Sequence, residues 1–93
     1  MKPDIVIGNE PGWIGGFTRH QAPEALFRNG SRIQKAKFGP GDATPLGSLG
    51  TVLGSLYLPE MGSVGYFVEW DWKPKVAVAI LGWRICRAAQ EPA

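Results

Sequence analysis

Two carboxylates stand two positions apart in the second half of the chain, and their spacing suggests chemistry. Glu69 and Asp71 end an alternating run of aromatic and β-branched residues that starts at Gly65. In a strand, side chains two positions apart share a face and lie about 7 Å apart. Carboxylates at that distance can act as an acid–base pair or bind a cation. The alternative is an ordinary solvated strand face whose acids pair with Lys73 or Lys75.

Six cations form a second candidate site, suited to phosphate groups. The segment 28–37 holds four of them and no acid, and two more stand near the C-terminus. If the first and last strands are neighbours, all six lie on one side and predict salt-dependent binding of nucleic acid. The net charge is only +2, so nucleic acid is not the favoured partner, and a solvated edge strand protected by lysine explains the same pattern. The six residues are Arg28, Arg32, Lys35, Lys37, Arg84 and Arg87.

Aromatic side chains form a third candidate site, suited to a ligand or a protein partner. It has four Trp among 93 residues, and Trp is enriched at interface cores. We expect one or two of them in the core, whereas Trp72, in a turn beside Pro74, should be exposed. Exposed aromatics near loops form a groove for a peptide or a flat cationic ligand, or they cover the interface of a homo-oligomer. The predicted ligand or partner surface consists of Tyr57, Trp70, Trp72 and Trp83.

The single histidine and the single cysteine do not complete a catalytic set. His20 lies in a segment rich in Gly and Pro without an acid or cysteine nearby, so we expect a solvated loop residue. Cys86, the only cysteine, excludes an internal disulfide and a multi-cysteine metal site, and should fill a small interior space. The sequence therefore predicts no catalytic residues, no metal site and no cofactor, and it favours a protein that is not an enzyme.

Short strands joined by turns would position these residues. Many Gly and Pro residues make segment 1–21 an irregular arm, either a flexible leader or a segment lying on the domain or on a partner chain. Pro23 and the following Asn-Gly predict a helical turn over 23–28, and Gly54 marks a bulge or bend. The expected domain covers 22–88, with a C-terminal tail at 89–93. The predicted strands are 31–37, 51–57, 64–71, 76–80 and 84–87, with a corner at 81–83.

The parity of the third predicted strand separates core from surface. Alternate residues face opposite sides, so one face is apolar and the other carries Phe67 with the two acids. At about 1.5–3 kcal/mol for each well-buried aliphatic side chain, the apolar face can hold a small domain together. The expected core consists of Val64, Tyr66, Val68, Trp70, Ile33, Val52, Val76, Val78, Ile80 and Ile85.

Length and composition set the remaining limits. The chain of 93 residues suffices for one small domain. Its charged content of 19% is low, which agrees with surface hidden in a homo-oligomer. Only three apolar residues follow the first four, and no apolar run approaches the roughly 20 residues of a membrane span. We expect a cytoplasmic protein without a membrane partner.

The order of the motifs resembles an SH3-like barrel. A basic strand is followed by Gly-x-x-Gly-x-Val at 47–52, Tyr-x-Val-x-Trp-Asp at 66–71, a short apolar strand and a corner. The glycines and valine of 47–52 are similar to the core of the KOW motif of ribosome- and transcription-associated barrels. This resemblance covers residues 30–87 and implies a five-stranded barrel whose first and last strands are neighbours.

The chain also resembles small uncharacterised bacterial proteins encoded on integron gene cassettes. An arginine-rich segment at 28–37 is followed by Pro-Gly-Asp at 40–42, Gly-Thr-Val-x-Gly-Ser at 50–55 and Gly-Tyr-Phe-Val-Glu-Trp-Asp at 65–71. This resemblance implies no known activity.

A third resemblance is to the plasmid-borne, trimethoprim-insensitive dihydrofolate reductase, a tetramer of SH3-like barrels around one pore. Segment 65–69 is similar to its central strand. The functional strand of that family reads Val-Gln-Ile-Tyr, whereas residues 76–79 here read Val-Ala-Val-Ala. The amide and phenol that would contact nicotinamide and pterin are missing, so the resemblance does not extend to this activity.

Together these patterns predict a mainly all-β protein, a small five-stranded SH3-like barrel with a short helical turn and an irregular N-terminal arm. The expected function is a non-enzymatic binding or adaptor module whose partner is an unknown protein or small ligand. The alternatives are a nucleic-acid-binding barrel and a pore-type oligomeric enzyme.

Overall fold

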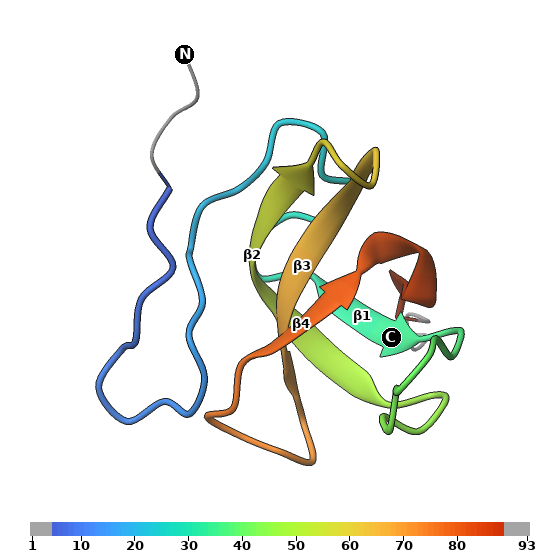
Figure 1. Cartoon of the computed structure of the whole chain (residues 1–93). Coiled ribbons are helices and arrows are strands. Elements are labelled where there is room, and N and C mark those ends of the chain that lie inside the picture. Colours follow the sequence, from blue (N-terminus) through green and yellow to red (C-terminus); the bar gives the residue numbers. More distant parts are fainter. Residues whose placement is uncertain (1–4, 89–93) are drawn as a thin grey trace, which may run out of the picture.

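The protein is mainly β, with five antiparallel strands in one sheet (Figure 1). A computed structural model describes residues 5–88, so the predicted tail at 89–93 and the first four residues of the arm lie outside the described residues. The strand order is β4-β3-β2-β1-β5, which confirms the predicted fold class and the pairing of the first and last strands. The elements are β1 (Arg32–Lys35), β2 (Leu49–Leu58), β3 (Ser63–Trp70), β4 (Val78–Leu81), the 3-10 turn η1 (Gly82–Arg84) and β5 (Ile85–Arg87).

The core lies on the face of the sheet that strand parity predicts. Trp70, Tyr66 and Val68 are buried on this face of β3, and the residues facing them from the other strands complete one cluster. Val64 and Val78, both expected in the core, are only partly buried and pack against that cluster. Val76 was expected there as well, but it lies before β4 and pairs in a parallel bridge with Ile14 of the arm. The core cluster consists of Phe27, Ile33, Val52, Tyr66, Val68, Trp70, Ile80 and Ile85.

The opposite face of the sheet is covered by the N-terminal arm. Phe17 is 3% exposed and packs with Leu53 and Phe67 in a second cluster. The arm folds back on itself, because Gly8 and Phe17 exchange backbone hydrogen bonds of 3.2 and 3.0 Å. Figure 1 shows its two blue legs beside the sheet. Of the two alternatives that the sequence leaves open for the arm, packing on the domain is the one observed for its described residues.

A bulge in β2 lets the arm approach the sheet closely. The pairing register of β2 with β3 shifts between Val52 and Gly54, as the glycine predicts. A side chain at Gly54 would collide with the backbone carbonyl of Thr18, so only glycine fits there. The next residue, Ser55, donates its N–H to the carbonyl of His20 at 2.7 Å. The bulge therefore works as the attachment point of the arm.

Segment 23–28 is not helical, contrary to the prediction. It forms turns and bends, because the N–H groups of Leu26 and Phe27 donate to the Tyr66 hydroxyl, at 2.9 and 3.4 Å, rather than to carbonyls one turn back. The expected strand over 31–37 ends early, since the N–H groups of Ala36 and Lys37 both donate to the Arg84 carbonyl. In residues 5–88, no helix is long and apolar enough to cross a membrane.

Candidate functional site

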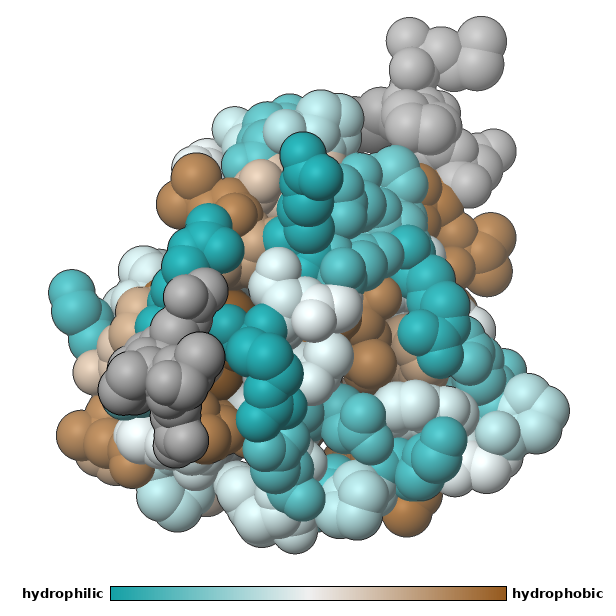
Figure 2. Space-filling view, turned by 180° about the vertical axis from the view of Figure 1, so that it is seen from behind, coloured by the Kyte–Doolittle hydropathy of each residue, from teal (hydrophilic) through white to brown (hydrophobic). Residues whose placement is uncertain are grey.

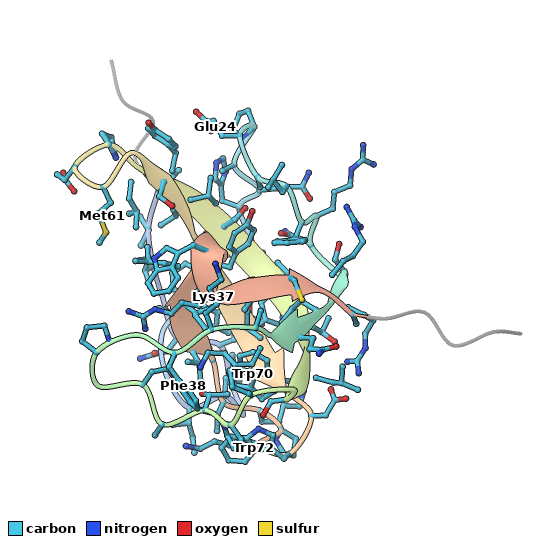
Figure 3. All side chains as sticks on the ribbon, turned by 90° about the vertical axis from the view of Figure 1, so that its right-hand side faces the viewer. Glu24, Lys37, Phe38, Met61, Trp70 and Trp72 are labelled. Carbon is cyan, nitrogen blue, oxygen red and sulfur yellow. The ribbon has the colours of Figure 1, made fainter. Side chains whose placement is uncertain are left out.

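The structure divides the four predicted aromatic residues between two hollows. Tyr57 and Trp83 line one hollow, which we call the aromatic groove. Trp70 and Trp72 line another, which we call the tryptophan cavity. Trp70 is only 1% exposed and belongs to the core cluster, so its prediction as part of an open surface is wrong. Figure 3 shows Trp70 and Trp72 at the end of the molecule opposite Glu24.

The aromatic groove has a volume of about 430 Å³ and three walls. The turn segment 22–28 supplies one wall, the hairpin between β2 and β3 supplies the second, and η1 supplies the third. Leu26, Tyr57 and Trp83 expose 77%, 42% and 47% of their surface, so the groove presents apolar and aromatic side chains to solvent. Its lining residues are Glu24, Leu26, Phe27, Tyr57, Gly62, Ser63, Val64, Tyr66, Gly82 and Trp83.

Two contacts hold the walls of the aromatic groove in place. The Tyr66 hydroxyl accepts the N–H of Leu26 at 2.9 Å, which joins the turn segment to β3. The guanidinium of Arg84 lies 5.0 Å from the centre of the Trp83 ring, a distance at which cation–π attraction stabilises the ring position. The groove is thus built before any partner arrives, which reduces the entropic cost of binding.

The tryptophan cavity, of about 300 Å³, lies between the loop after β1 and the β3–β4 connection. Asp42 and Thr44 come from that loop, while Lys73 follows β3 and Arg84 comes from η1. Trp72 is 56% exposed, as expected beside Pro74. Sequence reasoning missed Asp42 and Thr44 as lining residues, because a loop of Gly, Pro and small residues shows no periodicity that would place it.

An ion-pair cluster stands behind the tryptophan cavity. The Lys35 side chain is fully buried, and its Nζ lies 2.6 Å from Oδ2 of Asp42 and donates to the Thr44 carbonyl at 3.1 Å. Arg84 lies 3.5 Å from the same carboxylate. The hydrogen bond from Lys35 holds the pKa of Asp42 below its ordinary value, with help from the Thr44 N–H and Arg84. Lys35 was predicted as a phosphate contact, but burial removes it from any surface.

The remaining cations of the predicted basic patch are only partly available. The guanidinium of Arg32 binds both carboxylate oxygens of Asp71, which lowers the pKa of that acid. Arg28, Lys37 and Arg87 are exposed. The pairing of β1 with β5 brings strand residues of the predicted patch together. However, Arg32 is paired with an acid and Lys35 is buried, so the patch is weaker than the sequence suggests.

The two predicted carboxylates have separate partners. Asp71 binds Arg32, and Glu69 accepts the backbone N–H of Lys75 at 2.9 Å rather than pairing with its ammonium group. Lys75 has a positive φ of 63°, and the bond from its N–H to Glu69 is consistent with holding that turn. Both acids thus have structural partners, although these differ from the ion pairs with Lys73 or Lys75 that were the alternative to acid–base chemistry. Among residues 5–88, no three His, Cys, Asp or Glu side chains gather as a metal site would require.

His20 and Cys86 do not join either hollow described above. The backbone of His20 attaches the arm to β2, and its side chain is half-buried. Cys86 is exposed, so its prediction as an interior filler is wrong. The reason is parity, because Ile85 takes the inward position at the start of β5 and the next residue faces outward.

Comparison with known proteins does not identify a family. No protein-family model, no curated protein and no solved structure matches this chain. The resemblances to SH3-like barrels, integron-cassette proteins and the plasmid-borne reductase rest on sequence motifs alone.

Proposed function

We propose that this protein is a small non-enzymatic binding module that holds an extended peptide segment in the aromatic groove. The main support for this proposal is that Tyr57, Trp83 and Leu26 line the same solvent-exposed groove. These residues come from the end of β2, from η1 and from the turn segment 22–28. Aromatic side chains supply large contact area at low entropic cost, which is why peptide-binding grooves use them.

The lining of the groove indicates the chemistry of the peptide. Glu24 is the charged residue of that lining, and the other side chains are apolar, aromatic or small. A peptide with an aliphatic or proline side chain between Tyr57 and Trp83, followed by a basic residue near Glu24, would match this arrangement. The order of the strands supports the expected SH3-like barrel, since the first and last strands pair. The fold alone does not assign the partner, because one barrel can serve many functions.

A peptide-display selection on the immobilised full chain tests this function. The wild-type protein should enrich sequences with aliphatic or proline residues beside a basic residue. Trp83→Ala should abolish the enrichment because it removes one wall of the groove, whereas Trp72→Ala is a matched control at the opposite end of the molecule. No enrichment, or equal enrichment on both variants, would refute the proposal.

A second copy of the chain is the competing occupant of the groove. Light scattering of the wild-type protein and of Trp83→Ala over a range of concentrations distinguishes the two cases. A peptide-binding module keeps the same mass in both variants. A wild-type oligomer that dissociates in Trp83→Ala would assign the groove to a subunit interface instead.

A further inference from the structure

The tryptophan cavity contains hydrogen-bond donors that the protein itself does not use. The indole Nε1 of Trp70 is buried and has no acceptor among residues 5–88, and the same is true of the Nε of Arg84. Both residues line the cavity. Buried N–H groups nearly always find an acceptor, because leaving one unpaired costs free energy. Oδ2 of Asp42 is buried beside them, but it is an acceptor already held in ion pairs with Lys35 and Arg84. Two free donors on residues that line one cavity therefore indicate a ligand with acceptor oxygens.

The charges around the cavity favour an anionic acceptor. Lys73 and Arg84 line it, and Lys35 lies directly behind Asp42. Asp42 is the acid of this group, and its carboxylate is already shared between Lys35 and Arg84. The cluster thus holds more positive than negative charge, and a charge-assisted hydrogen bond is stronger than a neutral one.

The rest of the lining suits a small organic molecule rather than an inorganic ion. Val78 and Ile80 supply aliphatic surface and Trp72 supplies an exposed ring. The volume of about 300 Å³ lies at the small end of ligand pockets, which combine apolar walls with few polar groups. Figure 3 shows both Trp side chains at the same end of the molecule as the loop that carries Phe38.

From these observations we propose that the tryptophan cavity binds a compact organic carboxylate. Its carboxylate oxygens accept hydrogen bonds from the Trp70 indole and from Arg84, and its apolar part contacts Val78 and Ile80. This site shares no lining residue with the aromatic groove, although Arg84 at the cavity also contacts the Trp83 ring of the groove. Binding here does not depend on the peptide function proposed above, so the two proposals can fail independently.

The indole N–H signals in a nitrogen-15 correlation spectrum report directly on this site. The Trp70 signal is assigned with Trp70→Phe, and the remaining signals with single Trp→Phe variants of the other three. The full chain is then titrated with benzoate and isovalerate as probes. We expect a saturable downfield shift of the Trp70 indole proton, because a hydrogen bond to a carboxylate deshields it. Benzamide, which has the same ring without the charge, should give no saturable shift.

Two variants and one further probe make the test decisive. Arg84→Lys keeps the charge near Asp42 but removes the Nε donor, so the affinity for benzoate should fall about tenfold. Leu26→Ala, in the aromatic groove at a side chain that is 77% exposed, is the matched control and should leave the titration unchanged. Inorganic phosphate is the last probe. If phosphate shifts the signal and the carboxylates do not, the organic ligand class is wrong. If no probe shifts the Trp70 indole signal, or if benzamide shifts it as much as benzoate does, the two N–H donors bind only water and the proposal is overturned.

Discussion

Replacing Lys35 by Met tests whether the buried ion pair holds the loop after β1. The Lys35 side chain is 0% exposed and that of Asp42 is 6% exposed. Met keeps most of the aliphatic stem but leaves the carboxylate buried, with Arg84 at 3.5 Å as its remaining counter-charge. Breaking a buried ion pair from one side costs about 3–5 kcal/mol. Because Arg84 compensates in part, we expect a loss of about 3 kcal/mol in the free energy of unfolding.

Urea unfolding followed by tryptophan fluorescence measures this loss. With a slope of about 1–3 kcal/mol per M for a domain of this size, the midpoint should fall by about 1–3 M. The matched control is Arg32→Met, whose partner Asp71 is half exposed. An exposed pair contributes less than about 1 kcal/mol. Equal losses in the two variants would refute the reasoning, since burial would then make no difference.

A double variant separates the ion pair from simple packing. In Lys35→Met with Asp42→Asn, no unpaired carboxylate remains inside, and Arg84, which loses its acid partner, still reaches solvent with 19% of its side chain. The Asn side chain can still accept the Thr44 N–H, which lies 3.0 Å from the Asp42 oxygen. We therefore expect the double variant to recover most of the stability that Lys35→Met loses. If the losses of the two single variants simply add, the two charges do not interact.

The same pair predicts an acid-dependent loss of stability. The pKa of Asp42 is lowered from the ordinary 3.8 mainly by the hydrogen bond from Lys35, and that of Asp71 mainly by the bond from Arg32. A carboxyl group with a lowered folded pKa stabilises the fold above its unfolded pKa, and this contribution disappears as the pH falls through the folded value. The urea concentration at the unfolding midpoint of the wild-type protein should therefore decrease as the pH is lowered below about 4. In Lys35→Met this fall should be smaller, and an unchanged pH profile would contradict the assignment.

Three further predictions concern the arm and the basic patch. Phe17→Ala should lower the free energy of unfolding by about 3–5 kcal/mol, because its ring is buried against the outer face of the sheet. A loss below about 1 kcal/mol, as for a typical surface change, would mean that the arm does not stabilise the domain. Gly54→Ala should displace the arm and speed trypsin cleavage after Arg19, measured by mass spectrometry. The control is Gly8→Ala, where an added Cβ meets nothing within 4 Å, and unchanged cleavage in Gly54→Ala would contradict the close approach. Oligonucleotide binding, measured by fluorescence anisotropy, should show a log–log salt slope no steeper than about −3. Three of the six predicted cations, Arg28, Lys37 and Arg87, are exposed, whereas Arg32, Lys35 and Arg84 are paired with acids, and a steeper slope would restore the full basic patch.

Strand parity predicted the main core residues of β3 correctly because alternate side chains of a strand share a face, and Tyr66, Val68 and Trp70 all lie in the core cluster. The same rule, applied to β1, places Lys35 on the face of the buried Ile33. Because Lys35 is charged, the sequence favoured a surface position for it. That prediction was wrong because Asp42 supplies a buried partner. Such a partner lies in an irregular loop, and no sequence period shows which loop residue reaches the interior.

The arm shows why the second apolar face was not predicted. Phe67 stands on the face that carries the acids, and in the sequence it looks like one exposed aromatic residue on a polar face. It is buried because Phe17 and Leu53 pack against it, and that contact depends on the bulge at Gly54. The bulge itself was predicted, but a glycine in a strand does not say which segment approaches it.

The two hollows differ in chemistry because different segments close the two ends of β3. The turn segment 22–28 brings Leu26 and Phe27 to one end, so the aromatic groove is mainly apolar. The loop after β1 brings Asp42, with Lys35 behind it, to the other end, so the tryptophan cavity is charged. The ends of β3 are roughly 20 Å apart by strand geometry, beyond the range at which side-chain changes usually couple. The Trp83 ring also contacts Arg84 of the cavity, so the test uses Leu26→Ala, which should leave carboxylate binding in the cavity unaltered. Coupling in that variant would show that the sheet transmits one site's occupancy to the other.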